Sequence, residues 1–124
     1  MPAKMKLTAI TLDCADPRAL ATFYQQATGL ELVPESDDDF AGLSGDGGLF
    51  IGFQRVDDYQ APHWPDQSVP QQFHLDFGVD DLEEAEEVLL DLGAVKPGFQ
   101  PGGDRWRVFF DPAGHPFCLA LRRR

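Results

Sequence analysis

Two stretches of this chain follow one pattern: LTAITLDCADPRALATFYQQATG at residues 7–29 and FHLDFGVDDLEEAEEVLLDLG at residues 73–93. Each begins with the alternation of a strand, passes through an Asp into a helix with apolar residues on one side, and ends at Gly. The helix-opening residues Asp16 and Asp81 are 65 positions apart. Repetition at this spacing predicts a chain built from two copies of one small module.

The first copy has clear boundary signals. Asp16 is a favourable N-cap, and Pro17 fits the first helical position, where no backbone N–H is needed. Gly29 ends the helix, because glycine readily adopts the left-handed conformation of a helix C-terminus. Strands are predicted over residues 7–13, 31–33, 40–43 and 49–55.

The second copy repeats the order of elements. A strand over residues 73–79 precedes a helix that opens with the capping box of Asp81 and Glu84 and stops at Gly93. Strands over residues 106–110 and 117–121 flank a turn made by Asp111 to Gly114. The first copy has the order βαβββ, and the repeat extends this order to the second copy. The predicted class is α+β: two tandem βαβββ modules forming a paired, curved mixed sheet.

The domain prediction follows from length. Two modules this short would each bury little apolar surface alone, so we expect them to share one core in a single domain over residues 1–124. Module one covers residues 5–56 and module two covers residues 73–124. The aperiodic, Pro- and Gln-containing residues 57–72 are the linker.

Composition limits the partners. The 10 Lys and Arg residues are outnumbered by 21 Asp and Glu residues, which gives a formal net charge of −11. Such a surface repels phosphate backbones, so nucleic acid is not expected as a partner. No apolar run approaches the roughly 18 residues of a membrane span. We expect a cytoplasmic protein, not bound to a membrane, in which Cys14 and Cys118 are reduced thiols within strands.

Several strings carry a resemblance to a known superfamily. They are Phe23-Tyr24 before Gly29, His74-Leu75-Asp76 before Asp81, and DPAGHPF at residues 111–117. In these strings the chain resembles the glyoxalase, bleomycin-resistance and extradiol-dioxygenase superfamily, also called vicinal oxygen chelate, and within it the glyoxalase-like subgroup. The resemblance implies the paired-module fold, a small-molecule ligand and a homodimer. We assign Asp111, Pro112 and Gly114 to the turn rather than to a site.

The resemblance also bears on metal binding. In metal-dependent members the ligands, usually His or Glu, occupy four places, which fall here on Ala9, Gly52, His74 and Cys118. Alanine and glycine have no side-chain donor, and only His74 is of the usual type. We therefore expect no metal and no other cofactor. The alternative is a divalent-metal site rebuilt from His74, Asp76, Asp13 and Cys118, although no local spacing motif supports it.

Strand alternation predicts which side chains line the concave face. The ligand-binding candidates are Thr11, Asp13, Gly52, Gln54, His74, Asp76, Trp106 and Cys118. Small residues at former ligand places are expected to leave room for an organic molecule. His74 and Asp76 are the catalytic candidates, because a histidine beside a carboxylate can serve as a general base. The alternative is that His74 only forms hydrogen bonds within a polar sheet interior.

Two classes of function stay open. The first is a metal-independent protein that binds a small organic molecule, such as a cationic or aromatic one, in a concave cavity. The second is a glyoxalase-like enzyme, a lyase or isomerase acting on a small carbonyl compound or a dioxygenase relative, which uses His74 and Asp76 or a recruited metal. The sequence identifies neither the ligand nor whether the modules pair within one chain or across a dimer.

Overall fold

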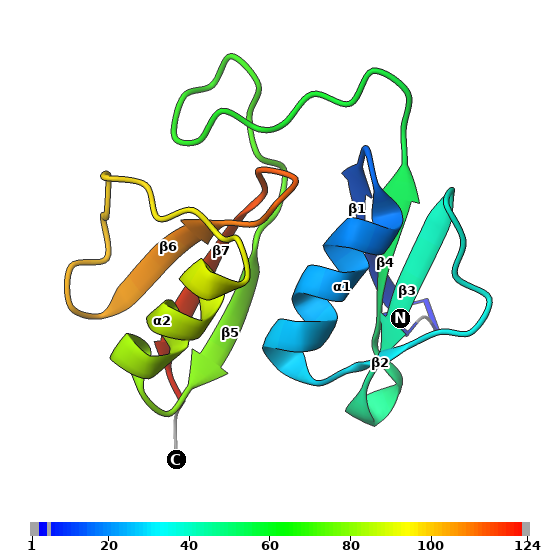
Figure 1. The fold of residues 1–124 in the computed structure, drawn as a ribbon, viewed down its shortest axis with the longest axis horizontal. Helices are drawn as coiled ribbons and strands as arrows, with labels where there is room; N and C mark the ends of the chain where they lie inside the picture. The colour runs from blue at the N-terminus through cyan, green and yellow to red at the C-terminus, as the bar shows by residue number, and fades with distance from the viewer. Residues whose placement is uncertain (1–2, 5, 123–124) are drawn as a thin grey trace. The chain divides into compact units, whose positions relative to one another are not determined.

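The order of strands and helices follows the two-copy pattern (Figure 1). The computed structural model describes residues 3–4 and 6–122. Residues 1–59 and 60–124 form two compact units, called here the first and the second unit. The boundary between them falls inside the predicted linker, residues 57–72. No helix in the described part of the chain is long and apolar enough to cross a membrane.

The first unit contains one helix and a four-stranded sheet. Its elements are β1 (Ala9–Cys14), α1 (Pro17–Thr28), β2 (Glu31–Leu32), β3 (Phe40–Ser44), a short 3₁₀ helix (Asp46–Gly48) and β4 (Phe50–Arg55). The strand order is β1-β4-β3-β2, with β1 parallel to β4 and the other pairs antiparallel. Strand β1 corresponds to the strand predicted at residues 7–13 and begins two residues later than expected.

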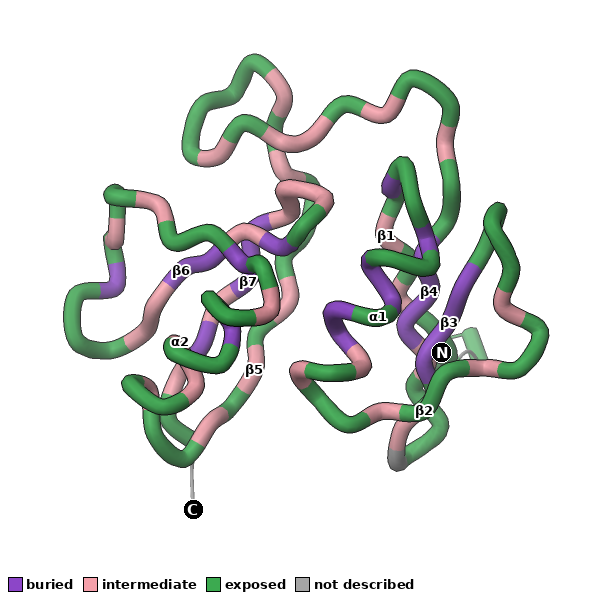
Figure 2. Tube along the Cα trace, in the orientation of Figure 1, coloured by how far each residue is buried: buried purple, intermediate pink, exposed green. Residues whose placement is uncertain are grey.

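Helix α1 has the predicted ends. The Asp16 carboxylate accepts a hydrogen bond from the backbone N–H of Ala19, and Gly29 adopts the left-handed conformation with φ of 79°. The helix packs on β3 and β4. Tyr24 is fully buried, and its ring stacks on Phe53 with centroids 5.7 Å apart. The core of this unit therefore lies between α1 and one face of the sheet (Figure 2).

The second unit repeats this plan with a shorter sheet. It contains β5 (Leu75–Val79), α2 (Leu82–Asp91), β6 (Trp106–Phe110) and β7 (Pro116–Leu121), in the strand order β5-β7-β6. The place of β2 is taken by a single bridge between Val95 and Phe110. The order is βαβββ-like, and both sheets are mixed, as the sequence predicted.

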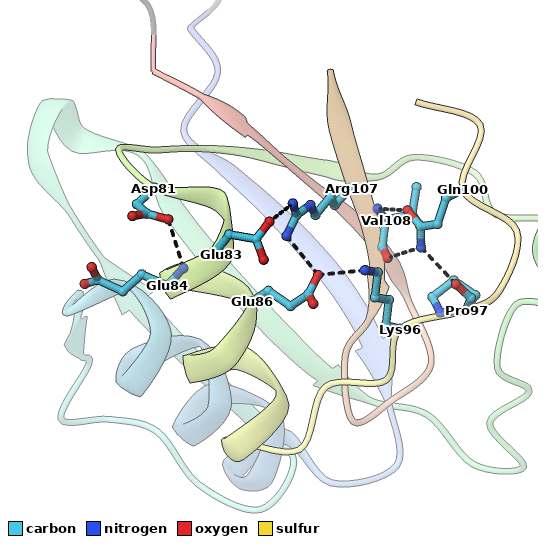
Figure 3. Close-up of polar contacts among 9 residues, drawn as sticks. All are labelled: Asp81, Glu83, Glu84, Glu86, Lys96, Pro97, Gln100, Arg107 and Val108. Carbon is cyan, nitrogen blue, oxygen red and sulfur yellow. Dashed lines mark hydrogen bonds and ion pairs between the residues drawn. The ribbon is translucent and has the colours of Figure 1, made fainter. Parts of the chain in front are cut away.

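A side chain forms hydrogen bonds with the outer edge of β6 (Figure 3). The Gln100 carboxamide donates to the Val108 carbonyl and accepts from the Val108 N–H, each at 2.9 Å, as a neighbouring strand would. On the helix side, Arg107 forms ion pairs with Glu83 and Glu86 of α2. These contacts fix β6 at its edge and against the helix, which leaves the opposite face of the sheet for other contacts.

The two units share one strand register. In the first unit, Thr11 pairs with Gly52 across β1 and β4. In the second, Asp76 pairs with Cys118 across β5 and β7. Thr11 and Asp76 are 65 positions apart, the spacing of the helix caps, and Gly52 and Cys118 are 66 apart. Residues of β1 and β4 therefore have defined counterparts in β5 and β7.

Candidate functional site

In each unit the helix covers one sheet face, and the other is called here the helix-free face. Residues that pair directly across strands point to the same face. In the second unit this face carries Asp76 from β5, Cys118 from β7 and Val108 from β6. In the first unit it carries Thr11 from β1 and Gly52 from β4. The predicted alternation is confirmed, since Ile10, Leu12, Leu75 and Phe77 are more buried than the residues between them.

Three side chains of the second unit form a cluster on its helix-free face. They are His74, Asp76 and Cys118, called here the His-Asp-Cys trio. Their donor atoms all lie within 4.8 Å of one another. His74 Nε2 is 3.4 Å from an Asp76 carboxylate oxygen, and these side chains are 41% and 71% exposed. Cys118 is half-buried. The trio is thus accessible from one side and anchored on two neighbouring strands.

The Cys118 thiol is held in its protonated form. Burial raises the pKa of this thiol to about 11, and the Asp76 carboxylate adds to the rise through its negative charge and a hydrogen bond from the thiol. A thiol acts as a nucleophile only as the thiolate. At neutral pH Cys118 is therefore a hydrogen-bond donor and not an activated nucleophile.

Aromatic rings border this face along β6. Trp106 pairs across the ladder with Ala120 and therefore shares the face with Cys118. An added Cβ at Gly102 would lie 2.4 Å from the Trp106 indole, so the ring packs closely on that glycine. Trp64 contacts Phe110, with centroids 6.3 Å apart. The face thus combines a polar cluster on β5 and β7 with an aromatic border.

The helix-free face of the first unit is different. The Phe40 ring lies over Gly52, where an added Cβ would be 2.6 Å from its Cζ atom. The Phe50 ring lies over Gly42 in the same way, and the two rings stack with centroids 6.1 Å apart. The expectation of open room at Gly52 is therefore wrong, because the glycine admits a ring of its own sheet. Thr11, Asp13 and Gln54 are exposed on this face.

The family's four metal places can be tested against this geometry. In the first unit, Ala9 supplies no donor and Gly52 lies beneath the Phe40 ring. In the second unit, His74 and Cys118 come together, with Asp76 as a third donor from outside the four places. The four-place centre therefore does not fit this chain, and the donor side chains that are present lie within one unit.

The turn between β6 and β7 has the structural role assigned to it. Asp111 is 3% exposed, and its carboxylate accepts hydrogen bonds from the N–H groups of Ala113 and His115. Gly114 has φ of 88°, and an added Cβ there would lie 2.8 Å from Ala61. The turn is thus held by its own carboxylate and packs on the linker.

Two features of the faces were not predicted. One is the Phe40–Phe50 stack, which depends on the pairing of β3 with β4. The other is Gln71, whose side-chain oxygen is buried without a hydrogen-bond partner among the described residues. Gln71 lies three positions before His74 in the sequence. It belongs to an aperiodic segment, so no sequence pattern indicates that its side chain is buried.

Solved structures with the same fold include enzymes of the glyoxalase kind and fosfomycin resistance proteins. The fosfomycin resistance protein FosX of Listeria monocytogenes, solved as a mutant with Mn(II) and 1S,2S-dihydroxypropylphosphonic acid, has a TM-score of 0.71 and 22% identity over 95% of this chain and 93% of its own. A glyoxalase/bleomycin resistance protein/dioxygenase family enzyme of Burkholderia phytofirmans PsJN has a TM-score of 0.70 and 21% identity, covering 94% and 98%.

A third similar structure is that of a possible glyoxalase from Bacillus cereus, with a TM-score of 0.69 and 18% identity over 94% of this chain and 99% of its own. At these identities the likeness shows the fold alone. No protein of curated function matches the sequence. Residues 9–120 match the glyoxalase-like domain family, and this range extends over both βαβββ-like modules. The chain therefore belongs to the glyoxalase-like domain family, as its sequence strings indicated.

Proposed function

We propose that this protein binds a small organic molecule without the four-place metal centre of its superfamily. The observation that carries the proposal is the Phe40 ring over Gly52, because it replaces a metal-ligand place with an apolar surface of the protein itself. Ala9 supplies no donor at the second place of that unit. Recognition of the ligand then depends on side chains rather than on a metal held between the modules.

The helix-free face of the second unit is the proposed binding surface. Asp76 supplies an exposed negative charge, and His74 and Cys118 supply hydrogen-bonding groups next to it. Trp106 adds an apolar border on the same face. Carboxylates beside aromatic rings suit a ligand with an apolar body and a cationic or polar group. The exposed Thr11, Asp13 and Gln54 of the first unit are secondary candidates for ligand contacts.

A second candidate function is catalysis by a lyase or isomerase of the glyoxalase-like kind. The observation in its favour is the 3.4 Å contact between His74 Nε2 and the Asp76 carboxylate. A carboxylate can hold an imidazole in one orientation, so His74 could remove a proton next to a carbonyl group of a substrate. Turnover of a bound carbonyl compound that is lost in His74→Ala would favour catalysis over binding alone.

The binding proposal is tested by a ligand screen in the presence of a chelator. Benzyltrimethylammonium and a panel of aromatic amines are added, and hits are identified by a raised melting temperature, because ligands that bind only the folded state stabilise it. Affinities are then measured by quenching of tryptophan fluorescence. We expect Asp76→Asn to weaken binding by about 1 kcal/mol or more, at least roughly 5-fold, because the charged partner is lost.

The matched control is Glu87→Gln, which removes one exposed carboxylate from α2. We expect it to leave the affinity unchanged, because an isolated surface charge contributes little. A hit whose affinity is indifferent to both Asp76→Asn and His74→Ala contradicts the proposed surface.

Assembly and location are proposed with the function. We propose a two-fold homodimer, since the edge strands β1, β2 and β5 lack a second neighbour among the described strands and pairing commonly covers such edges. Light scattering that gives only the 13.8 kDa monomer at micromolar concentration contradicts this. The cytoplasmic location and the exclusion of nucleic acid stay predictions from the sequence.

A further inference from the structure

We propose that the His-Asp-Cys trio forms a site for one thiophilic divalent ion, such as Zn²⁺, contained wholly within the second unit. The site goes beyond the proposed organic ligand, whose binding does not require the ion. It also differs from the four-place centre, because it takes nothing from the first unit and recruits Asp76 as a ligand.

The geometry of the trio is close to that of a metal site. Asp76 and Cys118 are direct neighbours in the β5–β7 ladder, and His74 lies two residues before Asp76. All three donor atoms fall within 4.8 Å of one another, with 3.4 Å between His74 and Asp76. Bond lengths of about 2.0 to 2.3 Å around tetrahedral zinc place ligand atoms roughly 3.3 to 3.8 Å apart. The His74–Asp76 distance of 3.4 Å already falls in this range, and the other donor distances lie within 4.8 Å.

The donor types select the ion. One imidazole nitrogen, one carboxylate oxygen and one sulfur form a mixed set that suits zinc or cobalt, whereas Mg²⁺ and Ca²⁺ prefer oxygen ligands only. The ion would bind Cys118 as the thiolate, so the thiol must release its proton. Three protein ligands would leave one position open for water or a ligand group.

One alternative is that His74, Asp76 and Cys118 only stabilise the fold. The internal repeat tests this alternative, because the first unit has the same strand pairing. The register-equivalent places in the first unit are occupied by Ala9, Thr11 and Gly52. That unit builds the same parallel ladder without a donor cluster. The fold therefore does not require His74, Asp76 and Cys118, and their convergence calls for another explanation.

The test is a spectroscopic titration of the chelator-treated protein with Co²⁺, followed by competition with Zn²⁺. We expect a thiolate-to-cobalt charge-transfer band in the near ultraviolet that saturates at one ion per chain and disappears when Zn²⁺ is added. Mg²⁺ should leave the band unchanged. Cys118→Ser should abolish the band, and Asp76→Asn should weaken Co²⁺ binding by about 10-fold or more.

The control is Cys14→Ala, which removes the other cysteine thiol of the chain, buried in the first unit. This variant should keep the charge-transfer band, and far-ultraviolet circular dichroism checks that each variant is folded. Absence of the band in the folded native chain overturns the proposal. So does a band that persists in Cys118→Ser or depends on Cys14. Because the organic-ligand screen is run with a chelator, the two proposals can fail separately.

Discussion

The helix-free faces of the two units differ at equivalent positions of one ladder. In the first unit, Phe40 on β3 lies across Gly52 on β4. In the second unit, the counterparts are Trp106 on β6 and Cys118 on β7, each 66 positions later. The Trp106 ring packs on Gly102 instead, and Cys118 faces Asp76. One scaffold thus supports an aromatic surface in one copy and a polar cluster in the other.

This difference follows from the position of the glycine on which each aromatic ring packs. A glycine in a strand lets another group approach the backbone closely. In the first unit that glycine, Gly52, is within the sheet, so the Phe40 ring covers the sheet. In the second unit the glycine is Gly102, in the loop before β6, so the Trp106 ring packs on the loop. On the helix-free face, Asp76 of β5 is exposed and Cys118 of β7 is half-buried, so both can be reached by a ligand.

The largest expected effect is that of Gly102→Ala. The added Cβ would lie 2.5 Å from the Trp106 carbonyl oxygen and 2.4 Å from its indole, and a backbone atom cannot move away easily. We expect a loss of about 2 to 3 kcal/mol in the free energy of unfolding, with a changed tryptophan emission. Chemical denaturation followed by fluorescence measures both. An unchanged midpoint would show that the loop and ring are not locked together.

A smaller effect is expected for Gly52→Ala. Here the contacts are to the far end of the Phe40 ring and to the Thr11 hydroxyl, which can both move. We expect a loss of about 1 kcal/mol, measured in the same way. Gly98→Ala is the control, because nothing lies within 4 Å of the added atom. If Gly52→Ala were as neutral as Gly98→Ala, the ring would not depend on the glycine beneath it.

The smallest effect concerns the reactivity of Cys118 and not stability. The reaction with iodoacetamide should accelerate as pH rises toward the thiol pKa of about 11, because only the thiolate reacts. Asp76→Asn removes a negative charge that disfavours the thiolate, which lowers this pKa and increases the rate several-fold at a fixed pH below 11. Cys118→Ser gives the background from Cys14. An equal or slower rate in Asp76→Asn contradicts the assigned contact between the carboxylate and the thiol.

Much of the fold could be predicted because its signals are local. Asp16 and Asp81 bond to nearby backbone N–H groups as N-caps, and Gly29 takes the left-handed conformation that its place requires. Strand alternation correctly assigned His74 and Asp76 to one side of β5. These features depend on neighbours within a few residues, so the sequence contains them directly.

The remaining features depend on how the strands pair and how the loops run in three dimensions. The covering of Gly52 by Phe40 requires the register of β3 on β4, and the edge contact of Gln100 requires the path of a loop across β6. The bridge at Val95 takes the place of a strand that alternation could not delimit. The closeness of Cys118 to Asp76 likewise depends on the parallel pairing of β5 with β7.

We propose that the main ligand contacts lie on the helix-free face of the second unit rather than on that of the first. The most direct measurement is an amide NMR titration of the ¹⁵N-labelled protein with a hit from the ligand screen. We predict that the largest chemical-shift changes fall on Leu75–Val79 and Pro116–Leu121. If the largest changes fell on Ala9–Cys14 and Phe50–Arg55, with the second unit unaffected, the ligand would bind the first unit instead.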